Sequence, residues 1–275
     1  MSEEIVAAEP WLVKEGTRPG SWKKRFFVIG KNALYYFSKQ EEGTAYKNLV
    51  DEGYADPPAK CLGSVPLENC SLWYGNPSSR VYCSESVKDS SPLGYFEIIT
   101  SNRRYRYFAP NQSQRLAWRQ AIADNRAIAE PWLLRFHKYD AHRNMVLEGT
   151  LGWKDSKGKI QDRLCVATFN FLLLFKKFEN HTPEKCIPLK GASFEGDPAT
   201  MIMKITTATG EEIEMECPDQ FCMDRWRGFL NQMATNQANI ERIQREPNFE
   251  VSEEEPDSFV DAALPDLSMM SGGKH

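Results

Sequence analysis

The stretch Trp22-Lys23-Lys24-Arg25-Phe26-Phe27-Val28-Ile29 decides the fold of the N-terminal half of this 275-residue chain. Basic residues fill its first half, and aromatic or β-branched residues fill its second half, a composition typical of a strand. The runs Trp11-Leu12-Val13 and Leu34-Tyr35-Tyr36-Phe37 flank it and have the same aromatic and β-branched character. Gly and Asn residues separate the runs, so we predict three successive strands joined by turns.

The same pattern continues to residue 127. Pro110-Asn111 ends the strands, and a helix is predicted from Ser113 to Ala127 because Trp118 and Ile122 share one helical face. Polar stretches with Gly or Pro, Glu41–Lys60 and Ser84–Pro92, are predicted to be loops. The four further strands of this half are predicted at 62–67, 71–74, 95–100 and 105–109.

The C-terminal half repeats this order. After its strands, Pro218-Asp219 opens a helix in which Cys222, Trp226, Phe229 and Met233 form one apolar stripe. The helix is expected to run to about Arg245, because Pro247 is the next breaker. The predicted class is therefore mainly β with α, in two units that each end in a Trp-bearing helix. Strands of the second unit are predicted at 147–153, 160–168, 169–178, 186–189, 200–207 and 211–216.

Several correlated motifs of the first unit resemble one family. Trp11–Gly16, Trp22–Val28, Leu34–Phe37 and Leu116-Ala117-Trp118 together resemble a pleckstrin-homology (PH) domain over residues 9–129, and Val65–Asn69 resembles its fourth-strand region. The pattern is most similar to the cytohesin-type PH domains, which bind 3-phosphorylated inositol lipids. This resemblance implies a curved seven-stranded antiparallel barrel or sandwich capped by the C-terminal helix, and a non-enzymatic membrane-targeting adaptor.

The resemblance also implies which residues bind the phosphoinositide headgroup. Lys14 would contact a ring phosphate, Arg18 would reach the headgroup from the loop, and the Tyr36 hydroxyl would donate to a phosphate. Lys23 and Arg25 would lie side by side on the second strand. The chain departs from the family at Gly20, where a further basic residue is common, and the inserted stretch leaves Lys39 and Lys60 only as candidates.

Strand geometry supports this site without the family. Residues 14–31 contain six basic residues and one acid, Glu15. Side chains at i and i+2 on a strand share a face, so Lys23 and Arg25 converge while Lys24 points away. An arginine fork matches a phosphate with two parallel hydrogen bonds. A solvated basic hairpin would look similar, but the Tyr36 strand and the Trp118 helix favour a pocket.

The second unit, residues 145–245, resembles a PH domain more weakly. When Arg163–Val166 is aligned with Arg25–Val28, and Leu172–Phe175 with Leu34–Phe37, Gln161 replaces Lys23 and Leu174 replaces Tyr36. If the first loop is one residue shorter, so that Leu151 matches Leu12, Trp153 replaces Lys14. This unit therefore has a degenerate site with a long C-terminal helix. Its basic loop could attract anionic lipid without specificity. That loop carries Lys154, Lys157 and Lys159.

Charge distribution separates the body from the tail. Residues 246–275 contain eight acids and one lysine, a net charge of −7 against −4 for the whole chain, so residues 1–245 carry +3. We predict a linker at residues 130–144 and a disordered acidic tail at 246–275. The tail could cover the basic pocket, and either the tail or the second unit could contact a protein partner.

Other classes of function find little support in the sequence. Common nucleotide, hydrolase and metalloprotease motifs are missing, so we predict neither an enzyme nor a cofactor. Seven scattered cysteines without a C-x-x-C pair predict reduced thiols and no metal site. The acidic net charge argues against nucleic acid. We expect a cytoplasmic protein recruited peripherally to membranes; the alternative is a protein-binding scaffold whose PH-like units bind proteins instead of lipid.

Overall fold

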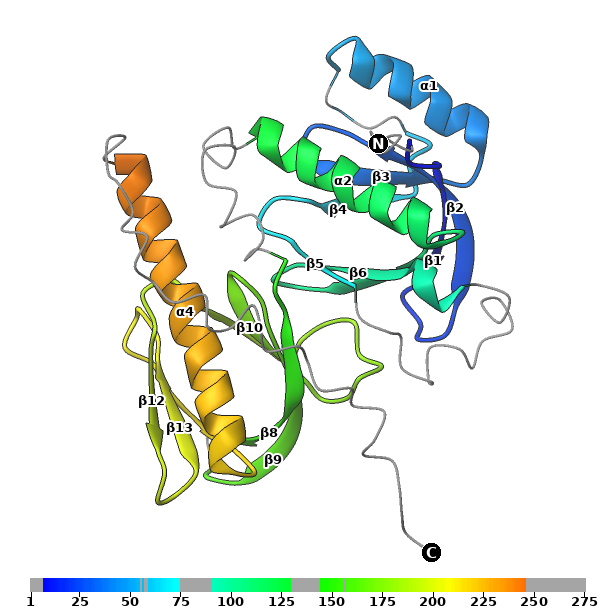
Figure 1. The fold of residues 1–275 in the computed structure, drawn as a ribbon. Helices are drawn as coiled ribbons and strands as arrows, with labels where there is room; N and C mark the ends of the chain where they lie inside the picture. The colour runs from blue at the N-terminus through cyan, green and yellow to red at the C-terminus, as the bar shows by residue number, and fades with distance from the viewer. Residues whose placement is uncertain are drawn as a thin grey trace, which may run out of the picture. The chain divides into compact units, whose positions relative to one another are not determined.

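The computed structural model describes residues 7–54, 56, 59–74, 91–129, 144–155 and 157–245 (Figure 1). Residues 1–238 form one unit, and a second unit begins at Asn239. The first unit contains two seven-stranded antiparallel sheets, each followed by a helix, which confirms the predicted fold class. The predicted linker lies outside the described residues except for Asn144, and the predicted acidic tail lies wholly outside them.

The first sheet has the strand order β4-β3-β2-β1-β7-β6-β5. Pairing of β1 with both β2 and β7 places Lys14 opposite Lys23 on one side and opposite Tyr107 on the other. A 3₁₀ turn, Pro92–Gly94, precedes β6. The strands are β1 (Trp11–Glu15), β2 (Trp22–Ile29), β3 (Ala33–Phe37), β4 (Gly63–Pro66), β5 (Ser71–Trp73), β6 (Tyr95–Ile99) and β7 (Arg104–Phe108).

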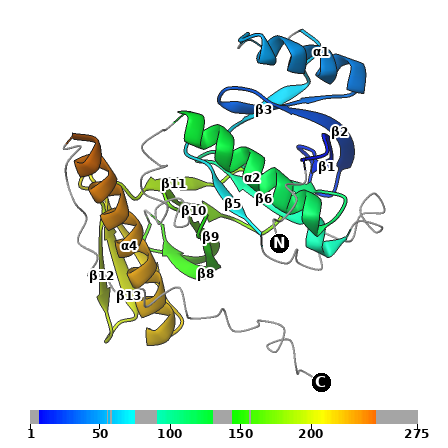
Figure 2. The ribbon, with the colours of Figure 1, turned by 45° about the horizontal axis from the view of Figure 1, so that its top comes forward.

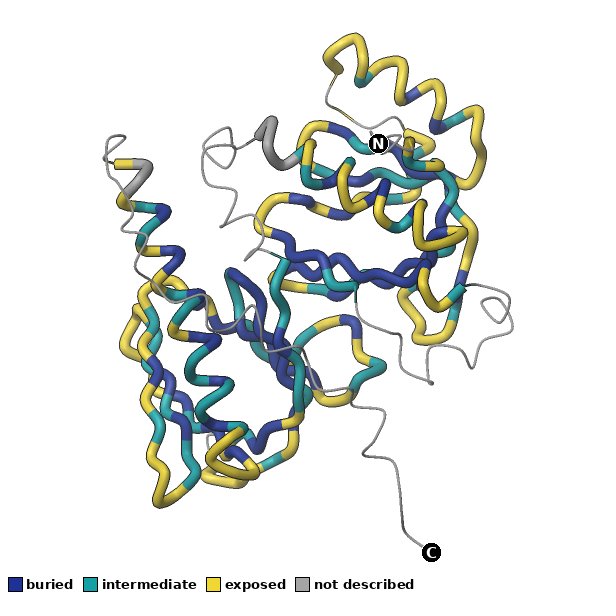
Figure 3. Tube along the Cα trace, in the orientation of Figure 1, coloured by how far each residue is buried: buried dark blue, intermediate teal, exposed yellow. Residues whose placement is uncertain are grey.

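Helix α2 (Gln112–Ala129) lies across the first sheet (Figures 1 and 2). Its buried Trp118 packs edge-on against Phe27 of β2, with ring centroids 6.3 Å apart. The Trp118 indole N–H donates to the Glu9 carbonyl at 2.9 Å, so this large side chain is buried without losing a hydrogen bond. Figure 3 shows the resulting band of buried residues along the strands.

The stretch predicted as a loop at Glu41–Lys60 contains a helix, α1 (Gln40–Asp51), so that prediction was wrong. Glycines and polar residues suggested a loop, but Tyr46 and Val50 are four residues apart and share a helical face. They cover Phe26 and Phe37, which point away from Trp118. Phe26 is therefore buried beneath α1, whereas its neighbour Phe27 faces the main core.

The second sheet has the order β11-β10-β9-β8-β14-β13-β12 and is followed by α4 (Gln220–Arg245). Strand β12 had not been located from sequence, because its Ser and Gly residues weaken the strand pattern. The helix begins after Asp219, whose carboxylate accepts the amide of Cys222 at 2.7 Å as an N-cap. The strands are β8 (Leu147–Lys154), β9 (Ile160–Ala167), β10 (Phe171–Phe175), β11 (Lys185–Pro188), β12 (Ser193–Asp197), β13 (Ile202–Thr206) and β14 (Glu212–Glu216).

None of the helices in the described part of the chain has an apolar stretch long enough to cross a bilayer.

Because α1 docks on β2, we predict that replacing one of its glycines with alanine destabilises the protein, which is the opposite of the usual effect in a helix. Alanine normally favours a helix over glycine by about 1 kcal/mol. A Cβ at Gly43, however, would overlap the Phe26 ring. We expect Gly43→Ala to lower the free energy of unfolding in urea, while Thr44→Ala, on the exposed side of α1, leaves it equal or higher. A stabilising Gly43→Ala would contradict the docked position of α1.

Candidate functional site

A pocket of about 290 Å³ opens beside the β1–β2 turn of the first sheet. Strands β1, β2 and β3 supply most of its wall, and the turn between β6 and β7 closes one side. Four of its residues are basic and one is acidic. The lining residues are Lys14, Glu15, Gly16, Thr17, Lys23, Arg25, Tyr36, Leu62 and Arg103.

Lys14 lies deepest among these basic side chains. It is 7% exposed, and its ammonium donates to the Glu15 carbonyl at 3.0 Å. The ammonium also lies 5.0 Å from the ring centre of Tyr36 and 5.8 Å from that of Tyr105. Burial, together with the positive charges of Arg103 and Arg25, lowers the pKa of Lys14 from 10.5 to about 8. An anion in the pocket would relieve this repulsion.

Strand alternation places the next two basic residues as the sequence predicted. Lys23 and Arg25 both line the pocket. Lys24 lies on the opposite face, where its ammonium is 5.4 Å from the ring centre of Trp11. The Arg25 guanidinium donates one hydrogen bond to the Lys24 carbonyl at 2.9 Å, so most of its N–H groups stay available for a ligand.

The remaining sequence candidates have different positions. Tyr36 lines the pocket from β3 and packs against Phe27, with ring centroids 5.8 Å apart. Arg18 is exposed in the β1–β2 turn and is not among the lining residues; its carbonyl accepts from the Ser21 amide and hydroxyl. Lys39 and Lys60 are exposed and do not line the pocket either.

Arg103 is a pocket residue that sequence reasoning missed. It lies in the turn between β6 and β7, and its guanidinium donates to the Gly16 carbonyl at 3.3 Å. Its guanidinium carbon also lies 5.1 Å from the ring centre of Tyr105. The available signal was the basic pair Arg103-Arg104 directly after the Ser-Asn turn, but no motif linked it to Lys14.

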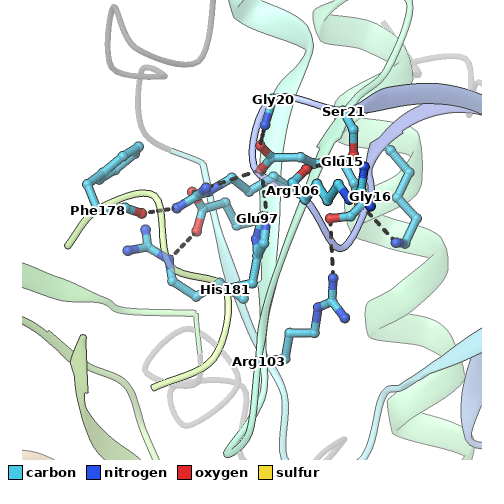
Figure 4. A network of polar contacts seen from close by, with 12 residues as sticks. Glu15, Gly16, Gly20, Ser21, Glu97, Arg103, Arg106, Phe178 and His181 are labelled. Carbon is cyan, nitrogen blue, oxygen red and sulfur yellow. Dashed lines mark hydrogen bonds and ion pairs between the residues drawn. The ribbon is translucent and has the colours of Figure 1, made fainter. Parts of the chain in front are cut away.

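The carboxylate of Glu15, the one acid of the pocket, is directed at Gly20 and Arg106 (Figure 4). One carboxylate oxygen accepts the Gly20 amide at 2.6 Å, and the other accepts Arg106 at 3.1 Å. Arg106 belongs to β7 and is 2% exposed. Because the Glu15 carboxylate is paired with Arg106 and four basic residues line the pocket, the net charge of the lining is positive.

Arg106 is part of a larger buried ion-pair network. Glu97 of β6 lies between Arg104, at 2.7 Å, and Arg106, at 3.4 Å, and it accepts the Tyr95 hydroxyl at 2.5 Å. Burial alone would raise the pKa of Glu97, but the two arginines outweigh it and hold the pKa below its usual value. Arg104 also contacts Glu148 of the second sheet at 2.8 Å.

His181 lies beside this network without carrying a charge. Its ring nitrogen is 3.7 Å from a Glu15 oxygen, which is longer than a hydrogen bond. Burial, with the positive charges of Arg106 and Arg103, lowers the pKa of His181 to about 4. The imidazole is therefore neutral at physiological pH, and its contact with Glu15 is not an ion pair.

The second sheet lacks an equivalent pocket chemistry. Leu151 pairs with Arg163 as Leu12 pairs with Arg25, so Trp153 and Gln161 occupy the positions of Lys14 and Lys23. Arg163 is buried, ion-paired with Glu184 at 2.7 Å, and hydrogen-bonded to Gln161 at 2.7 Å. Leu174, at the position of Tyr36, is fully buried.

In the described ranges no group of three or more His, Cys, Asp or Glu side chains is arranged to hold a metal ion.

Comparisons with known proteins find similarity in the first half of the chain. The PH domain family model matches residues 6–126. Mouse cytohesin-4 is 30% identical over 124 residues, which cover 42% of this chain and 28% of that protein. Mouse pleckstrin is 29% identical over 119 residues, covering 43% of this chain and 28% of that protein. The chain thus matches less than a third of the length of either relative.

Solved structures with similarity to this chain include PH domains. The C-terminal PH domain of pleckstrin in complex with D-myo-Ins(1,2,3,4,5)P5 is 13% identical, with a TM-score of 0.31; the match covers 33% of this chain and 99% of that one.

The proximity of Arg103 and Lys14 predicts a measurable coupling. We expect Arg103→Met to raise the pKa of Lys14 from about 8 part of the way to 10.5, because one like charge is removed while burial persists. NMR titration of the lysine side chains measures it. Arg18→Met, outside the pocket, is the matched control. An unchanged Lys14 pKa in the Arg103 variant would contradict the geometry of the pocket.

Proposed function

We propose that the chain is a non-enzymatic adaptor that binds phosphoinositide headgroups in the pocket of the first sheet, within the residues 6–126 that match the PH domain family model. The observation that supports this proposal most strongly is the convergence of Lys14, Lys23, Arg25 and Arg103 around one cavity. A ligand with several phosphates would neutralise all four positive charges at once. Basic residues scattered over a surface would not need such a ligand.

The chemistry of the lining suits a phosphorylated ring. Two arginines can each donate parallel hydrogen bonds to a phosphate, and the two lysines provide point charges. Tyr36 adds a hydroxyl donor on the third strand. Leu62 is about half exposed beside these polar groups, so the lining also offers apolar surface to a ligand at a membrane.

We further propose a preference for 3-phosphorylated inositol lipids, based on the resemblance of Lys14, the Lys23-Lys24-Arg25 run and Tyr36 to the cytohesin-type pattern. On this proposal the protein is cytoplasmic and joins the membrane peripherally. A protein partner would use the second sheet or the acidic residues 246–275 instead of the pocket.

Sedimentation with liposomes that each contain one phosphoinositide tests the proposed function directly. The full-length chain is expected to pellet most strongly with 3-phosphorylated lipids and weakly with phosphatidylserine at equal surface charge. Equal pelleting with all anionic vesicles would mean that the basic residues act as diffuse charge and not as a specific pocket. No pelleting with any of them would favour the protein-binding scaffold.

A comparison within β2 separates a pocket from diffuse charge. Arg25→Ala should weaken binding of a soluble inositol tetrakisphosphate by roughly ten- to a hundredfold, because a charge-assisted hydrogen bond contributes about 1.5–3 kcal/mol and about 1.4 kcal/mol is tenfold. Lys24→Ala should change it much less, since Lys24 lies over Trp11 on the other face. Calorimetric titration gives both affinities, and melting curves verify folding. Equal losses in the two variants would refute the pocket.

A further inference from the structure

The second sheet contacts the buried arginines of β7 through the connection between β10 and β11. The Phe178 carbonyl accepts the Arg106 guanidinium at 2.5 Å, and the Phe178 ring centre lies 4.6 Å from the guanidinium carbon. Three residues further on, the His181 carbonyl accepts the backbone N–H of Arg104 at 2.8 Å. Arg106 is thus held by a residue of the second sheet as well as by carboxylates of the first.

Two further hydrogen bonds connect these contacts to the β1–β2 turn beside the pocket (Figure 4). Arg106 donates to Glu15 at 3.1 Å, and Glu15 accepts the Gly20 amide at 2.6 Å. Gly20 has a φ of +77° and forms the β1–β2 turn at the mouth of the pocket. The same turn is closed by the Gly16 amide, which donates to the Ser21 carbonyl at 2.7 Å. Glu15 therefore connects the turn to the second sheet through Arg106.

The guanidinium of Arg106 has two possible carboxylate partners, Glu15 and Glu97. With one end held on the Phe178 carbonyl, its other end points at Glu15. Arg106 and Glu15 are both buried. Breaking their ion pair would leave two charges that water cannot solvate, at a large cost in free energy. We therefore expect a change at Phe178 to alter the contacts of Arg106 with Glu97 and with Glu15, and only Glu15 connects to the β1–β2 turn.

Apolar packing keeps this connection in place. The half-buried Phe178 side chain packs against the buried cluster of Trp22, Tyr95 and Phe108 in the first sheet. Ile99 of β6 shares a second cluster with Val166, Leu173 and Phe175 of the second sheet. A third link runs from the Asn170 side-chain amide to the Asn69 carbonyl at 3.2 Å.

We propose that the segment Phe178–His181 is a positioning element of the headgroup pocket, so that the second sheet completes a site whose ligand-binding side chains all belong to the first. The segment supplies none of the pocket-lining residues, and its hydrogen-bonded route to the β1–β2 turn runs through Arg106 and Glu15. This inference rests on the proposed function, and it gives the degenerate second unit a role that its lost basic residues do not provide.

The test uses the full-length chain and two truncations of buried or half-buried aromatics in the second sheet. Phe178→Ala removes the ring over Arg106. Phe194→Ala is the matched control, because Phe194 is buried in β12, at the opposite edge of the sheet from β11. Two quantities are measured: the affinity for a soluble inositol tetrakisphosphate that carries the 3-phosphate, and the amide exchange rate of Gly20 by NMR.

Phe178→Ala is expected to weaken inositol phosphate binding by about 5- to 150-fold, the usual range for coupling between sites. It should also accelerate Gly20 exchange by roughly tenfold, as expected when one hydrogen bond to a charged acceptor is loosened. Phe194→Ala should leave both quantities at their wild-type values. His181→Ala, which removes the contact with Glu15 and keeps Phe178, should accelerate Gly20 exchange in the same direction.

Wild-type binding and wild-type Gly20 exchange in Phe178→Ala would overturn the inference, and so would equal effects of Phe178→Ala and Phe194→Ala. The two proposals can fail separately. If the wild-type chain binds no inositol phosphate, the proposed function is wrong. Gly20 exchange still decides the coupling in that case, because acceleration by Phe178→Ala alone supports it and no acceleration overturns it.

Discussion

Two arginines on one strand, Arg104 and Arg106, are buried on β7, which lies between β1 and β6 in the first sheet. Leaving a buried charge without its partner costs about 3–5 kcal/mol, so the fold must supply carboxylates at fixed positions. Glu97 on β6, Glu15 on β1 and Glu148 on β8 do so. This requirement links both neighbours of β7 in the sheet, and also the second sheet, to one set of ion pairs.

That network also engages the one acid of the pocket. Glu15 stands beside Lys14 and lines the pocket, where its charge opposes part of the positive charge. Its carboxylate is bound by Arg106 and the Gly20 amide, so four basic residues face a single acid that is already paired. In the second sheet the arrangement is reversed, because Arg163 is satisfied by Glu184 and Gln161 and has little capacity left for a ligand. The two sheets share a strand order and differ in which basic residues their acidic side chains pair with.

Local pattern was enough to predict much of this structure. Alternation along Trp22–Ile29 correctly separated Lys23 and Arg25 from Lys24, and the helical spacing around Trp118 located α2. The failures concern features that depend on tertiary contacts. Helix α1 is stabilised by Tyr46 packing on Phe26 and Phe37, which its glycine-containing sequence does not reveal. Arg103 joins the pocket only because the β6–β7 turn folds beside Gly16. The contact of Phe178 with Arg106 joins residues 72 positions apart, and no periodicity encodes it.

If the proposed function is right, the first sheet contains one saturable headgroup site. An NMR titration of the 275-residue chain with a soluble inositol tetrakisphosphate measures its occupancy. We expect one ligand per chain, with the largest shift changes at Lys14, Lys23, Arg25 and Arg103 and a rise in the pKa of Lys14. Changes centred on Trp153 and Arg163, or changes that never saturate, would contradict it.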